Sequence, residues 1–197
     1  MRRSRGQGAG LAPASSRSDR RALLKAAAAG AASVLLAAHT PYGQWTVYRQ
    51  RNLFIVASRT DEAALILARA IVEGFATELP ESRARVTRAT DPVRIASLLA
   101  TRQLDVAVVS RGDAAAMRAG SGDFRAVGAV AVNSVAELGA HLMVTLDTFK
   151  PKHAYLLALS VDHLRPKLPI VAASAPEPTK PPIHPGAQAY YSGLPAP

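Results

Sequence analysis

The sequence predicts an α/β protein with three layers, in which helices cover both faces of a mainly parallel sheet. From residue 53 onward, short apolar runs of strand length alternate with segments of helical periodicity. Their order, β-α-β-α-β, is typical of a parallel sheet with crossover helices. Hydrophobic residues make up 49% of the chain, but many of them are alanines, which add little buried area, and aromatic residues are only 5%. The core should therefore be modest and built from Val, Leu and Ile.

The first unit is a strand over Leu53–Ala57 followed by a helix. The run LFIVA has no polar position, as expected for a strand that is buried on both faces. Either Thr60 or Asp61 can cap the next helix. The apolar residues that recur at helical spacing in this helix are Ala64, Leu65, Ala68, Ile71, Val72 and Phe75.

Two further strands and two helices complete the parallel part. A short strand is expected over Arg85–Ala89, and Thr90-Asp91-Pro92 then gives a strong helix start. The apolar face of that helix consists of Ile95, Leu98 and Leu99. The run LDVAVVS, Leu104–Ser110, is the clearest strand, and we expect a helix over Asp113–Arg118 after it.

The second half of the chain continues the pattern. We expect strands over Phe124–Val132 and His141–Thr145, then a helix over His153–Leu164 that ends before Pro166. The side chains predicted to line the buried side of this helix are Tyr155, Leu156, Leu159 and Leu164. The proline-rich run that follows excludes a helix or an interior strand.

Polar side chains at the ends of the first three strands form the candidate ligand site. The carboxyl ends of parallel strands meet at one edge of a sheet, where α/β proteins bind ligands. Hydroxyls, helix N-termini and arginines there suit a small organic anion such as a carboxylate. The alternative is that these residues are ordinary helix caps. The predicted ligand-binding residues are Ser58, Arg59, Thr60, Thr90, Ser110 and Arg111.

The net charge of +10 is concentrated at the N-terminus. Residues 1–25 hold seven basic side chains and one acid, and no interleaving of aromatic and basic residues follows. We therefore expect no nucleic-acid binding. Cysteine is absent, which excludes disulfides, thiolate metal sites and a cysteine nucleophile.

Residues 1–40 have the layout of an export signal. A basic region ends in Arg20-Arg21, and the apolar run Ala26–Ala38 follows. The segment RRALLK resembles the twin-arginine export motif, although Asp19 separates Ser18 from the arginine pair. This resemblance implies a periplasmic protein, or one anchored to the inner membrane if the segment is not cleaved. The alternatives are a basic amphipathic arm and a short buried helix.

Catalytic and metal-binding patterns do not occur. The five histidines form no HxH or HExxH pair, and the sequence contains no GxSxG, Walker or GxGxxG motif in a strand-to-helix context. We therefore expect no metal, no cofactor and no enzymatic activity.

Three segments together resemble one family, the TAXI-type solute receptors of tripartite ATP-independent periplasmic (TRAP) transporters. They are IHPGAQAYYSG near the C-terminus, LMVTLDTFKPKHAYLLALSVDHL, and IASLLATRQLDVAVVSRGDA. The resemblance implies one periplasmic binding-protein-like lobe over 45–168, without most of the family's second lobe. It also implies a membrane permease or another envelope partner. The alternative is an envelope structural or interaction protein that has lost ligand binding.

The C-terminal residues 169–197 are expected to form an extended, proline-rich tail that docks on the lobe. Pro185-Gly186 should turn the chain, and Ala187–Tyr191 should form about one turn of helix. Tyr190 or Tyr191 should pack back onto the lobe. We expect His184 to be a hydrogen-bonded anchor rather than a ligand-binding residue.

Overall fold

The computed structural model describes residues 52–170, 172 and 180–197. The predicted export segment, 1–40, and part of the predicted tail lie outside the described residues. The strands are β1 (Phe54–Ser58), β2 (Arg85–Ala89), β3 (Val106–Ser110), β4 (Val132–Leu138) and β5 (His141–Leu146). The helices are α3 (Glu62–Glu78), α4 (Pro92–Ala100), α5 (Arg111–Ala119), α6 (Pro151–Leu164) and α7 (Pro185–Tyr191), with short 3-10 turns at Pro80–Ser82, Gly122–Ala126 and Arg165–Lys167.

The five strands form one mixed sheet in the order β2-β1-β3-β5-β4. β1 pairs in parallel with β2 and β3, whereas β5 is antiparallel to both β3 and β4. The α/β class is therefore confirmed, but a mainly parallel sheet is not. The physical reason is a tight turn between β4 and β5, in which Gly139 adopts φ 69. The turn reverses the chain, so that β5 pairs antiparallel with β4.

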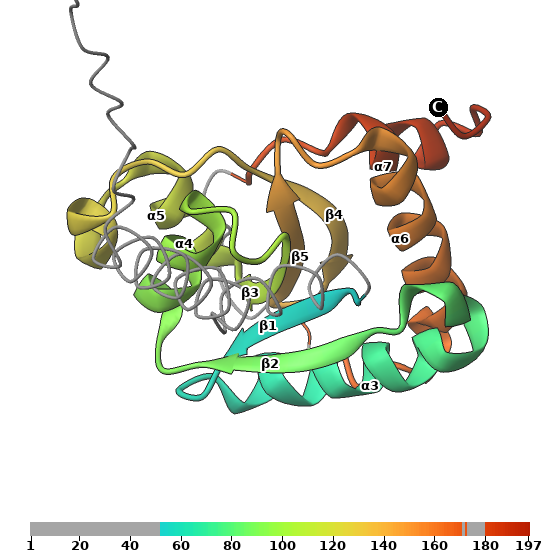
Figure 1. Ribbon diagram of the computed structural model, residues 1–197, viewed down its shortest axis with the longest axis horizontal. Helices are drawn as coiled ribbons and strands as arrows, with labels where there is room; N and C mark the ends of the chain where they lie inside the picture. The colour runs from blue at the N-terminus through green and yellow to red at the C-terminus, as the bar shows by residue number, and fades with distance from the viewer. Residues whose placement is uncertain (1–51, 171, 173–179) are drawn as a thin grey trace, which may run out of the picture. The chain divides into compact units, whose positions relative to one another are not determined.

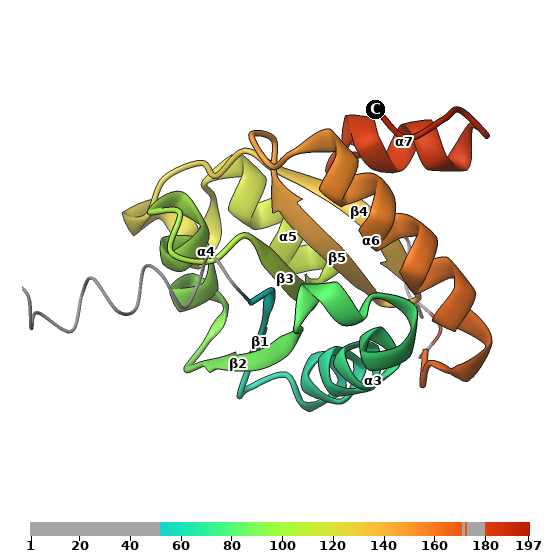
Figure 2. The same ribbon diagram turned by 45° about the vertical axis from the view of Figure 1, so that its right-hand side comes forward.

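Helices cover both faces of the sheet, as the three-layer prediction requires (Figures 1 and 2). On β3, Val106 and Val108 pack with α3 and α6, whereas Ala107 and Val109 pack with α4 and α5. All four side chains are buried, which explains why Val106–Val109 contains no polar residue.

The expected strand over Phe124–Val132 is wrong. Gly122–Ala126 is a 3-10 turn, and β4 begins only at Val132. Phe124 is 3% exposed, so its ring anchors a loop rather than a strand. Gly128, at φ 83, lies outside the extended region that a strand needs.

The predicted buried face of α6 is also largely wrong. Leu164 is buried, but Tyr155, Leu156 and Leu159 are only partly buried. The buried stripe is instead formed by Ala154, Leu157, Ala158, Ser160, Val161 and Leu164. Alanines on this stripe let the helix approach the sheet closely, and the larger side chains remain available on other sides of it: the Tyr155 ring packs edge-on against Tyr190 at 5.6 Å.

The described C-terminal residues contact β4 and the start of α6. Ser134 of β4 donates its amide to Pro182 and accepts from the amide of His184, both at 2.8 Å. His184 is fully buried; its Nε2 donates to the Phe149 carbonyl at 3.0 Å and its Nδ1 accepts from the Gly186 amide at 3.2 Å. These contacts confirm its anchoring role.

Both predicted tyrosines bond to the lobe. The Tyr190 hydroxyl donates to Asp162 at 2.9 Å, and the Tyr191 hydroxyl donates to the Val135 carbonyl at 3.0 Å. Burial raises the pKa of Tyr191 to about 12, so it remains a donor throughout the physiological range. In Figure 2, α7 lies beside the N-terminal half of α6.

We predict that Gly186→Ala destabilises the protein by about 1–3 kcal/mol, because a Cβ there would overlap the Pro151 carbonyl oxygen at 1.9 Å. The free energy of unfolding from urea titration measures the effect. Gly112→Ala is the matched control, since its Cβ would meet only Ser110 Oγ at 3.9 Å. Equal stability of the two variants would contradict the close packing of α7 on α6.

We predict that stability decreases as the pH falls below about 6.5 and that part of this loss belongs to His184. Burial lowers the pKa of His184 in the folded state, against hydrogen bonds to backbone carbonyls that raise it. A proton on Nδ1 would also break the bond from Gly186. The unfolded chain therefore binds the proton more tightly, and the stabilisation is present above the unfolded pKa and lost below it.

Urea unfolding of the wild type and of His184→Gln at pH values on either side of 6.5 tests this. The variant should be less stable at the higher pH but lose less stability on acidification. His163→Gln, at a side chain that is 55% exposed, is the control. Identical pH slopes for wild type and His184→Gln would show that the histidine does not contribute.

Candidate functional site

The strand order creates a switch point between β1 and β3. From β1 the chain crosses through α3 to β2 on one side, and from β2 it crosses through α4 to β3 on the other side of β1. α3 and α4 accordingly pack on opposite faces of the sheet. A crevice at the carboxyl ends of two such strands is where open α/β sheets bind ligands. The candidate residues lie along this edge because β1, β2 and β3 are parallel.

The end of β1 forms a small hydroxyl pair. The Ser58 and Thr60 hydroxyls lie 2.7 Å apart, and Ser58 Oγ also accepts from the Thr60 amide at 3.1 Å. Ser58 is 2% exposed, whereas Arg59 and Thr60 are exposed. The Arg59 amide donates to the Ala89 carbonyl at 2.9 Å, which fixes the end of β1 beside the end of β2.

Thr90 and Ser110 take part in helix capping. Thr90 Oγ1 donates to Asp91 at 2.7 Å, and Asp91 caps α4 by accepting from the Arg94 amide at 2.7 Å. The Arg94 amide and the Thr90 hydroxyl hold the pKa of Asp91 below its ordinary value. Ser110 caps α5, with Oγ accepting from the Asp113 amide at 3.0 Å. Three helices therefore begin at this edge.

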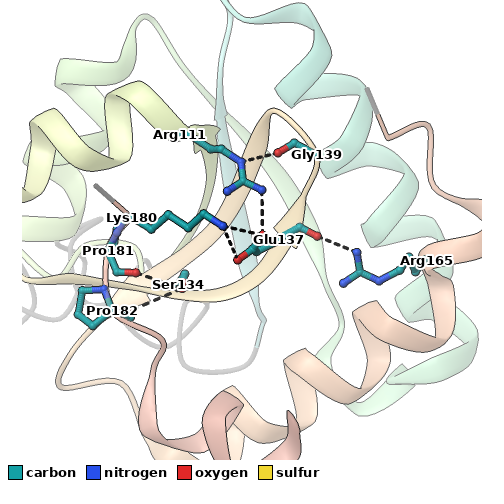
Figure 3. A network of polar contacts seen from close by, with 8 residues as sticks. All are labelled: Arg111, Ser134, Glu137, Gly139, Arg165, Lys180, Pro181 and Pro182. Carbon is teal, nitrogen blue, oxygen red and sulfur yellow. Dashed lines mark hydrogen bonds and ion pairs between the residues drawn. The ribbon is translucent and has the colours of Figure 1, made fainter. Parts of the chain in front are cut away.

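Arg111 is placed differently from a free anion-binding arginine. It is 8% exposed, its Nε donates to the Gly139 carbonyl at 2.5 Å, and its guanidinium donates to Glu137 at 2.9 Å. Glu137 also accepts from Lys180, so two cations from different elements meet one carboxylate (Figure 3). Burial would raise the pKa of Glu137, but hydrogen bonds from Arg111 and Lys180 hold it below its ordinary value.

Two residues at this edge were missed by the sequence analysis as a pair. Asp61 caps α3 through a 2.9 Å bond from the Ala64 amide, and its other oxygen lies 3.0 Å from Nε2 of His141. His141 faces Ser110 in the β3–β5 register and is 6% exposed. Its Nδ1 is buried and has no hydrogen-bond partner within the described part of the chain. The partners are 80 positions apart, so no local pattern could have joined them.

Within 52–170, 172 and 180–197, no group of three His, Asp or Glu side chains is arranged to hold a metal ion. None of the helices in those ranges is both long and apolar enough to cross a bilayer.

Comparison with known proteins identifies no relative: no model of a protein family matches the chain, and neither does any curated protein sequence.

We predict that Asp61→Ala costs more stability than Asp91→Ala, although both remove a helix cap. Loss of a cap costs about 1 kcal/mol, and Asp61→Ala additionally leaves buried His141 without its carboxylate partner. Urea unfolding of the two variants measures the difference.

A double-mutant cycle with His141→Gln isolates the pairwise contribution. A positive coupling between Asp61 and His141 is expected. Equal losses for the two aspartate variants, together with zero coupling, would show that the pair contributes nothing beyond the cap.

Proposed function

We propose that this chain is an exported, non-enzymatic solute-binding or transport-accessory protein that binds a small organic anion. In this proposal it is a shortened relative of the TAXI-type receptors of TRAP transporters, built on one binding-protein-like lobe. The export assignment depends on the arginine pair and apolar run of residues 1–40. The family assignment depends on the three sequence segments that resemble those receptors.

The observation that carries the proposal is the switch point between β1 and β3. Strand ends, three helix N-termini and several hydroxyls gather at one edge of the sheet. Helix N-termini favour negative charge through their amide groups and the helix dipole. Arg59 adds an exposed guanidinium beside them, which suits a carboxylate.

Within this site the predicted residues have different roles. Arg59 and Thr60 are exposed and would contact the anion directly. The hydroxyls at the strand ends, just before the helices begin, would also face the anion; they belong to Ser58, Thr90 and Ser110. Arg111 would act on the anion only through its position at the start of α5, because its guanidinium holds Glu137 and Gly139.

A second candidate function follows from the same contacts. Thr90, Ser110 and Arg111 each already have protein partners at the predicted site. This arrangement also suits an envelope interaction protein that has lost ligand binding and uses the lobe as a docking surface. A membrane permease or another envelope protein is the expected partner in both cases, because a single open edge buries a ligand poorly.

We predict that a small mono- or dicarboxylic acid raises the melting temperature of the wild-type chain in a saturable way, and that Arg59→Ala abolishes the shift. Arg59 is the residue to change because its side chain is exposed and its loss should not unfold the protein. Differential scanning fluorimetry against a panel of organic acids measures the effect.

Arg69→Ala, at an exposed position inside α3, is the matched control and should keep the response. No saturable response to any acid would favour the interaction protein. A response that survives Arg59→Ala would refute the assigned site without refuting anion binding.

A further inference from the structure

A cavity lies at the opposite edge of the sheet from the candidate anion site. It has a volume of about 390 Å³ and is bordered by residues that precede β1 and β3, by the end of α3 and by the beginning of α6. Its volume is within the range of small-molecule sites, about 300–1,000 Å³. No sequence pattern pointed to it.

The walls of this cavity are mainly aliphatic and aromatic. Leu53, Leu79, Leu156, Leu157 and Phe149 provide the apolar surface. An apolar wall with a few polar groups is the usual composition of a ligand pocket.

Hydrogen bonds hold one side of the rim in place. The Leu53 amide donates to the Ser82 carbonyl at 2.9 Å, and Ser82 Oγ donates to the Leu79 carbonyl at 2.7 Å. The Arg85 amide donates a hydrogen bond to the Leu53 carbonyl at 2.8 Å. These hydrogen bonds connect the 3-10 turn Pro80–Ser82 to the residue before β1 and hold this side of the cavity in a defined position.

The lining also contains two carboxylates, Glu81 and Asp105, and the imidazole of His153. Glu81 and Asp105 come from separate elements, the 3-10 turn and the loop before β3. Burial raises the pKa of Asp105, and the nearby His153 lowers it by a smaller amount. Asp105 and Glu81 are exposed carboxylates that border an otherwise mainly apolar cavity, and an incoming ammonium group would supply them with a counter-charge.

We propose that this cavity binds a small organic cation with an apolar body, a primary alkylamine or arylalkylamine. The ammonium group lies between Asp105 and Glu81, and the hydrocarbon part packs against Leu79 and Leu156. This site differs from the proposed anion site in both position and charge, so neither depends on the other.

The test uses the full chain and phenethylamine as the probe, with isothermal titration calorimetry and thermal shift as readouts. The amine should bind saturably, and Asp105→Asn should weaken binding about tenfold or more, the usual effect of losing a charge-assisted hydrogen bond. Asp105→Asn should fold normally, because Asp105 is an exposed residue in the loop before β3. Asp123→Asn, in the 3-10 turn on the other side of the sheet, is the control.

Two further arms make the result decisive. 2-Phenylethanol, which has the same apolar body without the charge, should bind much more weakly than the amine. Leu156→Phe, which fills the apolar wall, should weaken the amine while leaving any response to carboxylic acids unchanged. Equal binding of the alcohol and the amine, unchanged affinity in Asp105→Asn, or no binding to the wild type would each overturn the proposal.

Discussion

The reversal at Gly139 is the constraint on which the rest of the structure depends. It inserts β5 antiparallel between β3 and β4, and this insertion brings His141 to the carboxyl-end edge opposite Ser110. The same turn supplies the Gly139 carbonyl that accepts from Arg111, and it ends the strand that carries Glu137. One hairpin thus builds the second half of the sheet, buries a histidine beside the candidate site and fixes the arginine at the start of α5.

The hairpin also leaves β4 at the edge of the sheet, where unpaired backbone groups invite association with other strands. The C-terminal residues cover much of that edge. The isolated bridge between Ser134 and Ile183 occupies one part of it, and the Tyr191 hydroxyl donates to the Val135 carbonyl. Arg165, in the 3-10 turn after α6, donates to the Glu137 carbonyl. A cavity of about 350 Å³ remains between this edge and the docked residues. The segment from Pro182 to Tyr191 therefore protects the sheet edge, with buried His184 as its anchor.

Local signals made about half of this fold predictable. Apolar runs located β1, β3 and β5, and the capping residues Asp61 and Asp91 located the starts of α3 and α4, because both signals act within a few residues. The helices expected from Asp113 and His153 begin two residues earlier, at Arg111 and Pro151. The rest depends on contacts between distant positions. No local pattern around Arg111 predicts its contact with Glu137, 26 positions away, and none around Asp61 predicts its contact with His141. On α6, size misled the prediction, since close packing against the sheet selects Ala154 and Ala158 over Tyr155 and Leu156.

The position of Arg111 limits how the candidate anion site can work. Arg111 is 8% exposed, and the ion pair of its guanidinium with Glu137 already compensates for the water contacts that it lost on burial. An anion that displaced Glu137 from Arg111 would leave that carboxylate with Lys180 as a remaining cationic partner but without the buried guanidinium. Exchange of one anion for the other therefore brings little net gain. In the proposed site, recognition of an anion would therefore come from groups that are exposed before binding, and among the predicted site residues Arg59 carries the exposed charge.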